Sequence, residues 1–395
     1  MDVAVIAGII MIISVVVMLV MGVPIGISIG MSSALAMITI LPFGPGIVTC
    51  AQKMFTGVNS FSLLAIPFFI LAGNIMNNGG IAIRLVNCAR LISGRLPGSL
   101  AQTNIVANML FGAISGSGTA AAAAIGGTMA PIELEEGYDK DYVAAVNIAS
   151  APTGQLIPPS NTLIVYATVA GSVSVAALFM AGYIPGIAWG ISLMFIAGYM
   201  AKKRGYVSTF SVTPKEALKV LWDALPSLLL IIIVIGGILK GVFTATEGSA
   251  IAVVYALILS LCYRSLKIKD LPSIILSSCK TTCIVIFMIG VSSIMSWVMA
   301  YTMIPTAIAN AMLSLSSNKY VILLLMNVIL LVVGTFMDPT PAVLIFTPIF
   351  LPICQSFGMD PVQFGIMIVF NLCIGTITPP VGVILYGVQG GGNIH

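Results

Sequence analysis

The chain has 395 residues, of which 59% are hydrophobic and 7% charged, with a net charge of +4 and a mean hydropathy of +1.14. A soluble domain carries about 25% charged residues, so this composition excludes a soluble enzyme or nucleic-acid-binding module and indicates an all-α polytopic membrane protein. The only histidine is the terminal His395, which excludes Ser-His-Asp, Cys-His and histidine-rich metal chemistry, and no enzyme activity is expected.

Apolar runs of about 20 residues, the length that crosses a bilayer, follow one another along the chain. The first run has no basic residues before it, so we expect a spanning helix there and not a cleaved signal peptide. The predicted spans lie near residues 3–21, 24–41, 61–80, 142–170, 175–200, 224–243, 246–262 and 272–300.

Two further blocks, 98–135 and 318–356, are each long enough for two helical arms and are interrupted at mid-length. The first break falls at the small residues 115–119 (SGSGT), and the second at 335–340 (TFMDPT). We therefore expect two re-entrant helical hairpins. The acidic stretch from Glu133 to Asp141, which follows the first hairpin, is expected to be a solvated cytoplasmic connection.

The basic residues support this layout. With the N-terminus outside and both hairpins returning to their own side, only Lys53, Lys240 and Lys319 of the 16 basic residues fall outside, which leaves 13 inside. Cytoplasmic loops are enriched in Lys and Arg. We therefore predict that the N-terminus lies on the side of the membrane opposite the cytoplasm.

An internal repeat appears when the sequence is shifted by 221 residues. Nine of the 41 positions from 119 to 159 are then identical, including the paired prolines 158–159 and 379–380. An odd number of predicted spans separates the hairpins, so the two repeats are expected to be inverted, an architecture typical of secondary transporters. The predicted organisation is a first repeat at 1–200 (hairpin 98–135, broken helix 142–170), a cytoplasmic linker with an amphipathic helix at 201–223, and a second repeat at 224–395 (hairpin 318–356, broken helix 361–390).

The repeat also predicts a helix beyond the given sequence. The span at 175–200 has its expected partner near 396–421, so the natural protein is expected to continue with one more helix.

Two proline pairs interrupt otherwise helical stretches at repeat-equivalent positions, in 152–161 (PTGQLIPPSN) and 373–382 (CIGTITPPVG). Each pair removes two amide donors and frees carbonyl groups. In a membrane, such unwound backbone survives where protein packs around it or where it lines a polar cavity. A cage of carbonyl and hydroxyl oxygens suits a hard monovalent cation, while a kinked helix without a ligand is the alternative.

Asp338 is the only acidic residue that this layout places at membrane depth, and an intramembrane carboxylate is a candidate functional group. The alternative is a protonated aspartate that caps the second hairpin arm, with Pro339 at the first helical position. Its repeat partner is Ser117. Arms that begin near Gly118 and Pro339 direct their positive N-termini toward mid-membrane, which favours an anionic substrate.

These motifs resemble a known family, the large membrane subunit of TRAP (tripartite ATP-independent periplasmic) transporters. The resemblance covers essentially the whole chain, including the 334–341 hairpin and the 376–382 break. The segments that carry it most clearly are 112–118 (GAISGSG), 125–131 (IGGTMAP), 137–139 (GYD) and 157–160 (IPPS).

The resemblance implies an elevator-type symporter, with two hairpins in a transport domain that moves against a scaffold domain. It implies Na⁺ as the coupling ion, with no organic cofactor and no other metal. Family sodium ligands carried onto this sequence are Ser115, Ser117, Gly154, Ile157 and Pro159 for one site, and Gly334, Asp338, Gly375 and Thr378 for the other. The substrate region is expected around Gly116, Thr119, Asn161, Thr340 and Thr376.

The resemblance also implies partners. They are a separate four-helix small membrane subunit, a soluble periplasmic substrate-binding protein and an organic anion substrate. Sialate is the first expected substrate and a C4-dicarboxylate the second. The competing hypothesis is an autonomous sodium-coupled anion transporter that needs no binding protein.

Overall fold

The computed structural model describes residues 3–171, 173–206, 213–315, 318–379 and 382–385, and in these residues all regular secondary structure is helical. The helices of the first half are α1 (Val3–Val20), α2 (Ile25–Ile40), α3 (Phe43–Val58), the short 3-10 helix η1 (Phe61–Leu64), α4 (Ala65–Asn78), α5 (Ile81–Ser93), α6 (Ser99–Ser115), α7 (Gly118–Glu135), α8 (Lys140–Ser150), α9 (Thr153–Leu156), α10 (Asn161–Ala170) and α11 (Val175–Arg204).

The second half contains the same kinds of element. Its helices are α12 (Pro214–Leu239), α13 (Ala245–Cys262), the 3-10 helix η2 (Ile268–Asp270), α14 (Leu271–Tyr301), α15 (Ile304–Leu315), α16 (Lys319–Gly334), α17 (Pro339–Ser356) and α18 (Pro361–Gly375).

Six helical segments in the described part of the chain are long and apolar enough to cross a membrane, and further apolar helices are shorter. This agrees with the prediction of a polytopic all-α protein. The six segments are Phe61–Asn78, Val175–Arg204, Pro214–Leu239, Ala245–Cys262, Ile268–Tyr301 and Pro339–Ser356.

The two blocks expected to hold two arms each are both helix–turn–helix units. Helices α6 and α7 are separated by residues 116–117, and α16 and α17 by residues 335–338. The first proline pair also breaks a helix as expected, because α9 ends at Leu156 and α10 begins at Asn161. After α18 the chain turns at 376–379, and residues 380–381 and 386–390 of the predicted second broken helix lie outside the described residues.

Two sequence-based expectations are corrected. Residues 214–223, expected to form a linker helix, are the first turns of the 26-residue helix α12, which starts with a capping box between Thr213 and Glu216. Helices α3, α5 and α15 were not predicted as separate elements. They are short, and α3 and α5 carry basic residues, so no uninterrupted apolar run marks them.

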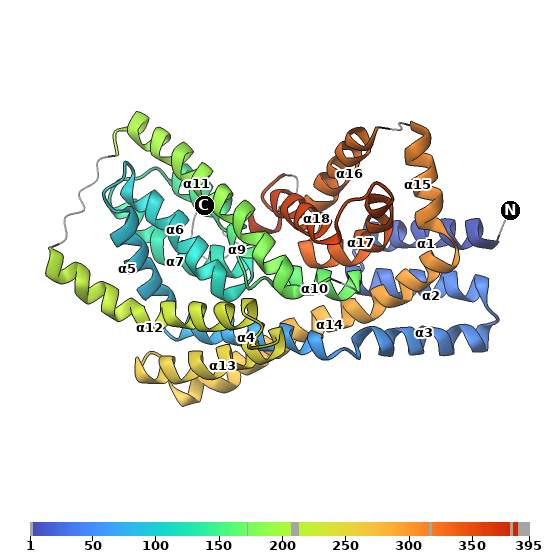
Figure 1. Cartoon of the computed structure of the whole chain (residues 1–395), viewed down its shortest axis with the longest axis horizontal. Coiled ribbons are helices and arrows are strands. Elements are labelled where there is room, and N and C mark those ends of the chain that lie inside the picture. The colour runs from blue at the N-terminus through green and yellow to red at the C-terminus, as the bar shows by residue number, and fades with distance from the viewer. Residues whose placement is uncertain (1–2, 172, 207–212, 316–317, 380–381, 386–395) are drawn as a thin grey trace.

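The helices group around the two hairpins. Figure 1 shows α3, α4, α12, α13 and α14 along one side of the molecule, with α6, α7 and α11 above one end and α16, α17 and α18 above the other. Helix α10, from the first half of the chain, packs against α17 and α18 from the second half. The two halves therefore share one packed interior.

Close packing of α10 on α18 depends on Gly365. A Cβ atom added there would lie 2.3 Å from the ring of Tyr166. Tyr166 is fully buried, and its hydroxyl donates a hydrogen bond to the carbonyl oxygen of Pro361 at 2.5 Å. The ring therefore has no room to move away from an added methyl group.

We expect Gly365→Ala to lower the free energy of unfolding by about 1–3 kcal/mol through overpacking. The control is Gly236→Ala in α12, where an added Cβ has no neighbour within 4 Å and the higher helix propensity of alanine adds up to about 1 kcal/mol. Thermal unfolding in detergent measures both variants. Equal effects of the two substitutions would contradict the packing argument.

Candidate ion and substrate site

The tip of the first hairpin is a turn between two helices whose ends are fixed locally. Gly116 ends α6 in the left-handed conformation (φ 63°), which glycine adopts without steric cost. Ser117 then caps α7 by accepting a hydrogen bond from the amide of Ala120. Its hydroxyl also lies 3.1 Å from the Thr119 hydroxyl, and the Ser115 hydroxyl donates to the carbonyl oxygen of Ser117. Three predicted hydroxyl-bearing residues therefore meet at one turn.

This tip rests directly on the first helix break. A Cβ added to Gly112 would lie 2.0 Å from Cα of Gly154, so α6 and α9 touch backbone to backbone. A Cβ on Gly116 would lie 2.7 Å from the Pro159 carbonyl oxygen, and the Asn161 amide donates to the Gly116 carbonyl oxygen at 3.4 Å. The structure thus brings Ser115, Ser117, Gly154 and Pro159 of the first predicted sodium site into one region.

The second hairpin tip repeats this arrangement. Asp338 caps α17 by accepting from the Thr340 amide at 3.2 Å, and Pro339 occupies the first helical position. A Cβ on Gly375 would lie 2.5 Å from Cα of Gly334. The Thr378 hydroxyl donates to the Ile374 carbonyl oxygen at 2.7 Å, within the same turn. Gly334, Gly375 and Thr378 of the second predicted site therefore lie together at the contact between α16 and α18, and Asp338 lies in the turn that follows Gly334.

One backbone hydrogen bond links each tip to the second residue after its proline pair. In the first repeat, the Asn161 amide donates to Gly116; in the second, the Gly382 amide donates to the Thr335 carbonyl oxygen at 2.9 Å. The two donors are 221 residues apart, which is the shift of the sequence repeat. The pseudo-symmetry found in the sequence therefore extends to the donors of these two bonds, while the acceptors, Gly116 and Thr335, lie two positions out of register with the repeat.

The two halves of the site meet in the interior. Ile384, from the second half, packs with Ala122 and Ala151 from the first, and all three are buried. A Cβ on Gly118 would lie 3.1 Å from the Ile384 side chain. The tips and breaks therefore form one continuous region built from both repeats.

The residues of the predicted substrate region divide between the tips. Gly116, Thr119 and Asn161 lie at the first, and Thr340 and Thr376 at the second. Asn161 Oδ1 is buried and has no hydrogen-bond partner among the described residues, which leaves an acceptor free beside the first tip. Thr376 is completely buried, and its hydroxyl donates to the Cys373 carbonyl oxygen at 2.7 Å.

Ile157 differs from the other predicted ligands of the first site. Its side chain packs toward α11, since a Cβ added at Gly186 would lie 2.6 Å from Ile157 Cγ1. Only its backbone is therefore placed beside the break. The amide of Ile157 is already used, because it donates to the Thr153 carbonyl oxygen at 2.8 Å, so its carbonyl oxygen is the group that remains to bind an ion.

The charged and polar groups of the site favour a cation near Asp338 and an anion near the N-termini of α7 and α17. Asp338 forms no ion pair with any described residue, so its carboxylate lacks a protein cation. The N-termini of α7 and α17 point their positive ends at the tips. The described residues contain no cluster of three His, Cys, Asp or Glu side chains that would hold a transition metal. Oxygen ligands suit hard cations instead.

Sequence reasoning missed a buried polar network behind the first tip, and the structure corrects the expectation that Glu133 is solvated. Glu133 is 0% exposed, and Asn104 Nδ2 donates to its carboxylate at 3.4 Å. Asn104 Oδ1 accepts from Asn108, which also donates to Asn147 and Ser150. Burial raises the pKa of Glu133 to about 8. The only signal of this network in the sequence is that Asn104, Asn108 and Asn147 are polar residues within apolar runs.

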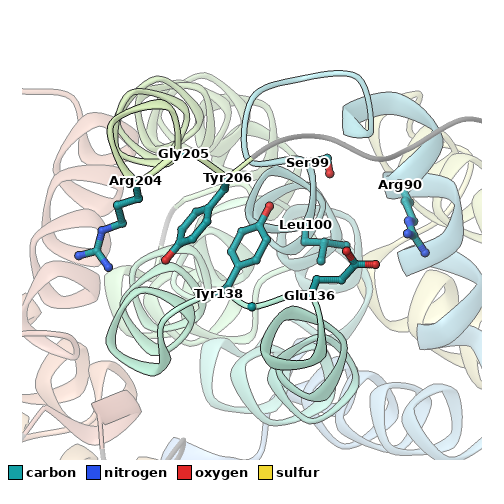
Figure 2. A pocket seen from close by; sticks show the side chains of 9 residues that line it. Arg90, Ser99, Leu100, Glu136, Tyr138, Arg204, Gly205 and Tyr206 are labelled. Atoms are coloured by element: carbon teal, nitrogen blue, oxygen red, sulfur yellow. The ribbon is translucent and has the colours of Figure 1, made fainter.

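A polar pocket of about 370 Å³ lies at the far end of α7. Figure 2 shows the rings of Tyr138 and Tyr206 between Arg204 and Arg90; the two rings stack at 4.2 Å, and Arg204 pairs with Asp139. Helix α7 has 18 residues and rises about 1.5 Å per residue, so the pocket lies about 27 Å along it from the tip. It contains none of the predicted ligands.

Comparison with known proteins gives a consistent family match. The model of the "Tripartite ATP-independent periplasmic transporter, DctM component" family matches residues 12–393. The chain is 55% identical over 355 residues to the "Uncharacterized protein YgiK" of Salmonella typhimurium, covering 90% of this chain and 82% of that protein. It is 39% identical over 362 residues to the "Sialic acid TRAP transporter large permease protein SiaM" of Vibrio cholerae, covering 91% and 84%.

Other similar proteins are named for different substrates, including C4-dicarboxylate and 2,3-diketo-L-gulonate. Among solved structures, the Alcanivorax borkumensis YdaH transporter superposes with a TM-score of 0.63 at 14% identity, covering 88% of this chain and 81% of that one. At this identity the likeness supports the fold alone.

The buried carboxyl of Glu133 predicts a pH effect on stability. Because its pKa is raised from 4.5 to about 8 on folding, its contribution to stability is fully present below pH 4.5 and is lost as pH rises through about 8. We therefore expect Glu133→Gln, which stays neutral, to gain melting temperature relative to the wild type between about pH 6 and 9. The exposed neighbour Glu136 gives the control, Glu136→Gln, which should follow the wild type. A constant difference between Glu133→Gln and wild type across this range would contradict the assignment.

Proposed function

This chain belongs to the DctM component family of tripartite ATP-independent periplasmic transporters, and we propose that it is a sodium-coupled importer of an organic anion. Its relatives are permeases, so the chain is a membrane transport protein and not an enzyme. The observation that carries the proposal is the repeat-equivalent docking of two hairpin tips on two helix breaks through the amides of Asn161 and Gly382.

The proposed sodium sites lie at these two contacts. Carbonyl and hydroxyl oxygens supply the first site, and Asp338 adds a negative charge to the second. Support comes from the backbone contact between Gly112 and Gly154 and from that between Gly334 and Gly375, which bring tip and break oxygens together. The residues proposed as ligands are Ser115, Ser117, Gly154, Ile157 and Pro159 at the first site and Gly334, Asp338, Gly375 and Thr378 at the second.

The proposed substrate is an organic anion bound near the same tips. The N-termini of α7 and α17 favour negative charge, and Asn161 offers a buried, unpartnered oxygen that can accept from a substrate hydroxyl. Sialate is the first choice because SiaM, a relative at 39% identity, is named for it. A C4-dicarboxylate is the second, from the relatives named for that substrate.

The proposed transport cycle is an elevator movement of the helices that carry the tips and breaks. Helix α4 touches the first tip closely, since a Cβ at Gly73 would lie 3.3 Å from Cα of Ser115. Because Gly73 has no side chain, the tip can move along α4 without a steric clash at this crossing. The chain is proposed to sit in the bacterial inner membrane with a periplasmic N-terminus.

The family is described as a tripartite transporter, which supports two proposed partners for this chain. One is a separate small membrane subunit, and the other is a periplasmic binding protein that delivers the substrate. An autonomous carrier is the alternative.

Reconstitution distinguishes these two functions. The chain and its small subunit are placed in liposomes, with the binding protein outside, and uptake of labelled sialate and succinate is measured with and without an inward sodium gradient. We expect uptake of one anion to require both sodium and the binding protein. Uptake without the binding protein would establish the autonomous alternative, and sodium-independent uptake would overturn the coupling.

Asp338→Asn is expected to raise the sodium concentration for half-maximal uptake at least about tenfold, which corresponds to about 1.4 kcal/mol of lost binding free energy. The control is Asp360→Asn. Asp360 caps α18 by accepting from the Val362 amide at 2.7 Å and also precedes a proline, but it is exposed and lies away from the tips. If both variants shift the sodium dependence equally, Asp338 acts as a helix cap and not as a ligand.

The charge of the transported complex gives a further prediction. Two sodium ions with one monocarboxylate carry one net positive charge inward, which gains about 2.3 kcal/mol per 100 mV. Sialate uptake should therefore increase when a potassium diffusion potential makes the liposome interior negative. Two sodium ions with a C4-dicarboxylate carry no net charge, so that substrate at the same stoichiometry should show no response.

A further inference from the structure

A hydrogen bond between two buried side chains joins the two helix breaks directly. The Cys373 thiol donates to Gln155 Oε1 at 3.3 Å. Gln155 lies in α9 of the first repeat and is 5% exposed, whereas Cys373 lies in α18 of the second and is fully buried. The two residues are 218 positions apart in the chain, so this bond depends on how the two repeats are packed.

Each partner is also tied to its own half of the site. Gln155 follows Gly154, the glycine in contact with α6, and its side-chain amide carbon would lie 3.2 Å from a Cβ at Gly118, the first residue of α7. It therefore touches the base of the first tip. A movement of that tip relative to α9 would displace the Gln155 amide.

Cys373 has the corresponding position in the second half. It lies two residues before Gly375, the glycine in contact with Gly334 of α16. The Cys373 carbonyl oxygen accepts from the Thr376 hydroxyl, and Thr376 is the repeat equivalent of Gln155. The bonded pair thus extends from the base of the first tip to the helix that packs on the first arm of the second hairpin.

We propose that Gln155 and Cys373 are positioning residues that couple the two half-sites, so that sodium binding at one favours sodium binding at the other. This inference rests on the proposed function. Neither side chain is a proposed ligand. Because both are buried, a shift of one half-site alone would leave an amide oxygen without a donor, which is unfavourable in the interior. Coupling between sites of this kind typically changes affinity by about 5- to 150-fold.

The test is equilibrium binding of ²²Na⁺ to the purified chain in complex with its small subunit, with choline chloride holding ionic strength constant. For the wild type we expect a Hill coefficient above 1, with 2 as the upper limit for two coupled sites. Gln155→Met removes the acceptor and Cys373→Ala removes the donor, and each should lower the Hill coefficient to 1 or below. Cys373→Ser keeps a donor and should retain the wild-type value.

A matched control and a double variant exclude a general packing effect. Cys354 is also a buried cysteine, but its thiol contacts Met326 within the second half of the chain, so Cys354→Ala should leave the Hill coefficient unchanged. The double variant Gln155→Met/Cys373→Ala should match either single variant, because both remove the same bond.

The outcomes separate the inference from the function on which it rests. A wild type that binds no sodium overturns both. Sodium binding that stays cooperative in Gln155→Met and Cys373→Ala, or that becomes equally non-cooperative in Cys354→Ala, overturns the coupling role and leaves the proposed sodium sites in place.

Discussion

The structure depends on one constraint, which is that backbone exposed by a broken helix must find partners where water is scarce. The proline pair at 158–159 interrupts a helix, and the tip of the first hairpin occupies the interruption. Glycines at 112 and 154 allow the two backbones to touch. Larger residues would hold them apart and leave carbonyl groups of the break without neighbours, so the glycines follow from the same constraint as the hairpins.

The pseudo-symmetry of the two half-sites is close in geometry and unequal in charge. Equivalent amides, those of Asn161 and Gly382, bond to the two tips, and equivalent glycines, 154 and 375, pack on the adjacent arms. The capping residues differ, since Ser117 is neutral and Asp338 is acidic. One tip thus carries a neutral hydroxyl and the other a carboxylate, and the two proposed sodium sites are expected to differ in affinity.

The sequence was sufficient for those features that obey local rules. The small residues and prolines at the two mid-length breaks predicted both hairpin turns, and the Asp338-Pro339 pair predicted the cap of α17. Sequence patterns failed to predict the features that depend on tertiary contacts. The short helices α3 and α5 have no long apolar run, and Glu133 lies in an acidic stretch that is typical of solvated loops. Its burial results from packing against Asn104 on another helix, which no local pattern encodes.

The contact between Gln155 and Cys373 shows the same limit at the site itself. Alignment of the repeats pairs Gln155 with Thr376 and Cys373 with Pro152, so symmetry alone does not predict that Gln155 and Cys373 meet. They meet because α9 packs against α18 across the interface between the repeats. This contact is one of several between the repeats, which include the packing of α10 on α17 and α18, and within it the Cys373 thiol bonds to the buried Gln155 side chain. The proposed coupling would therefore be a property of how the two halves are joined, beyond what either half-site contains.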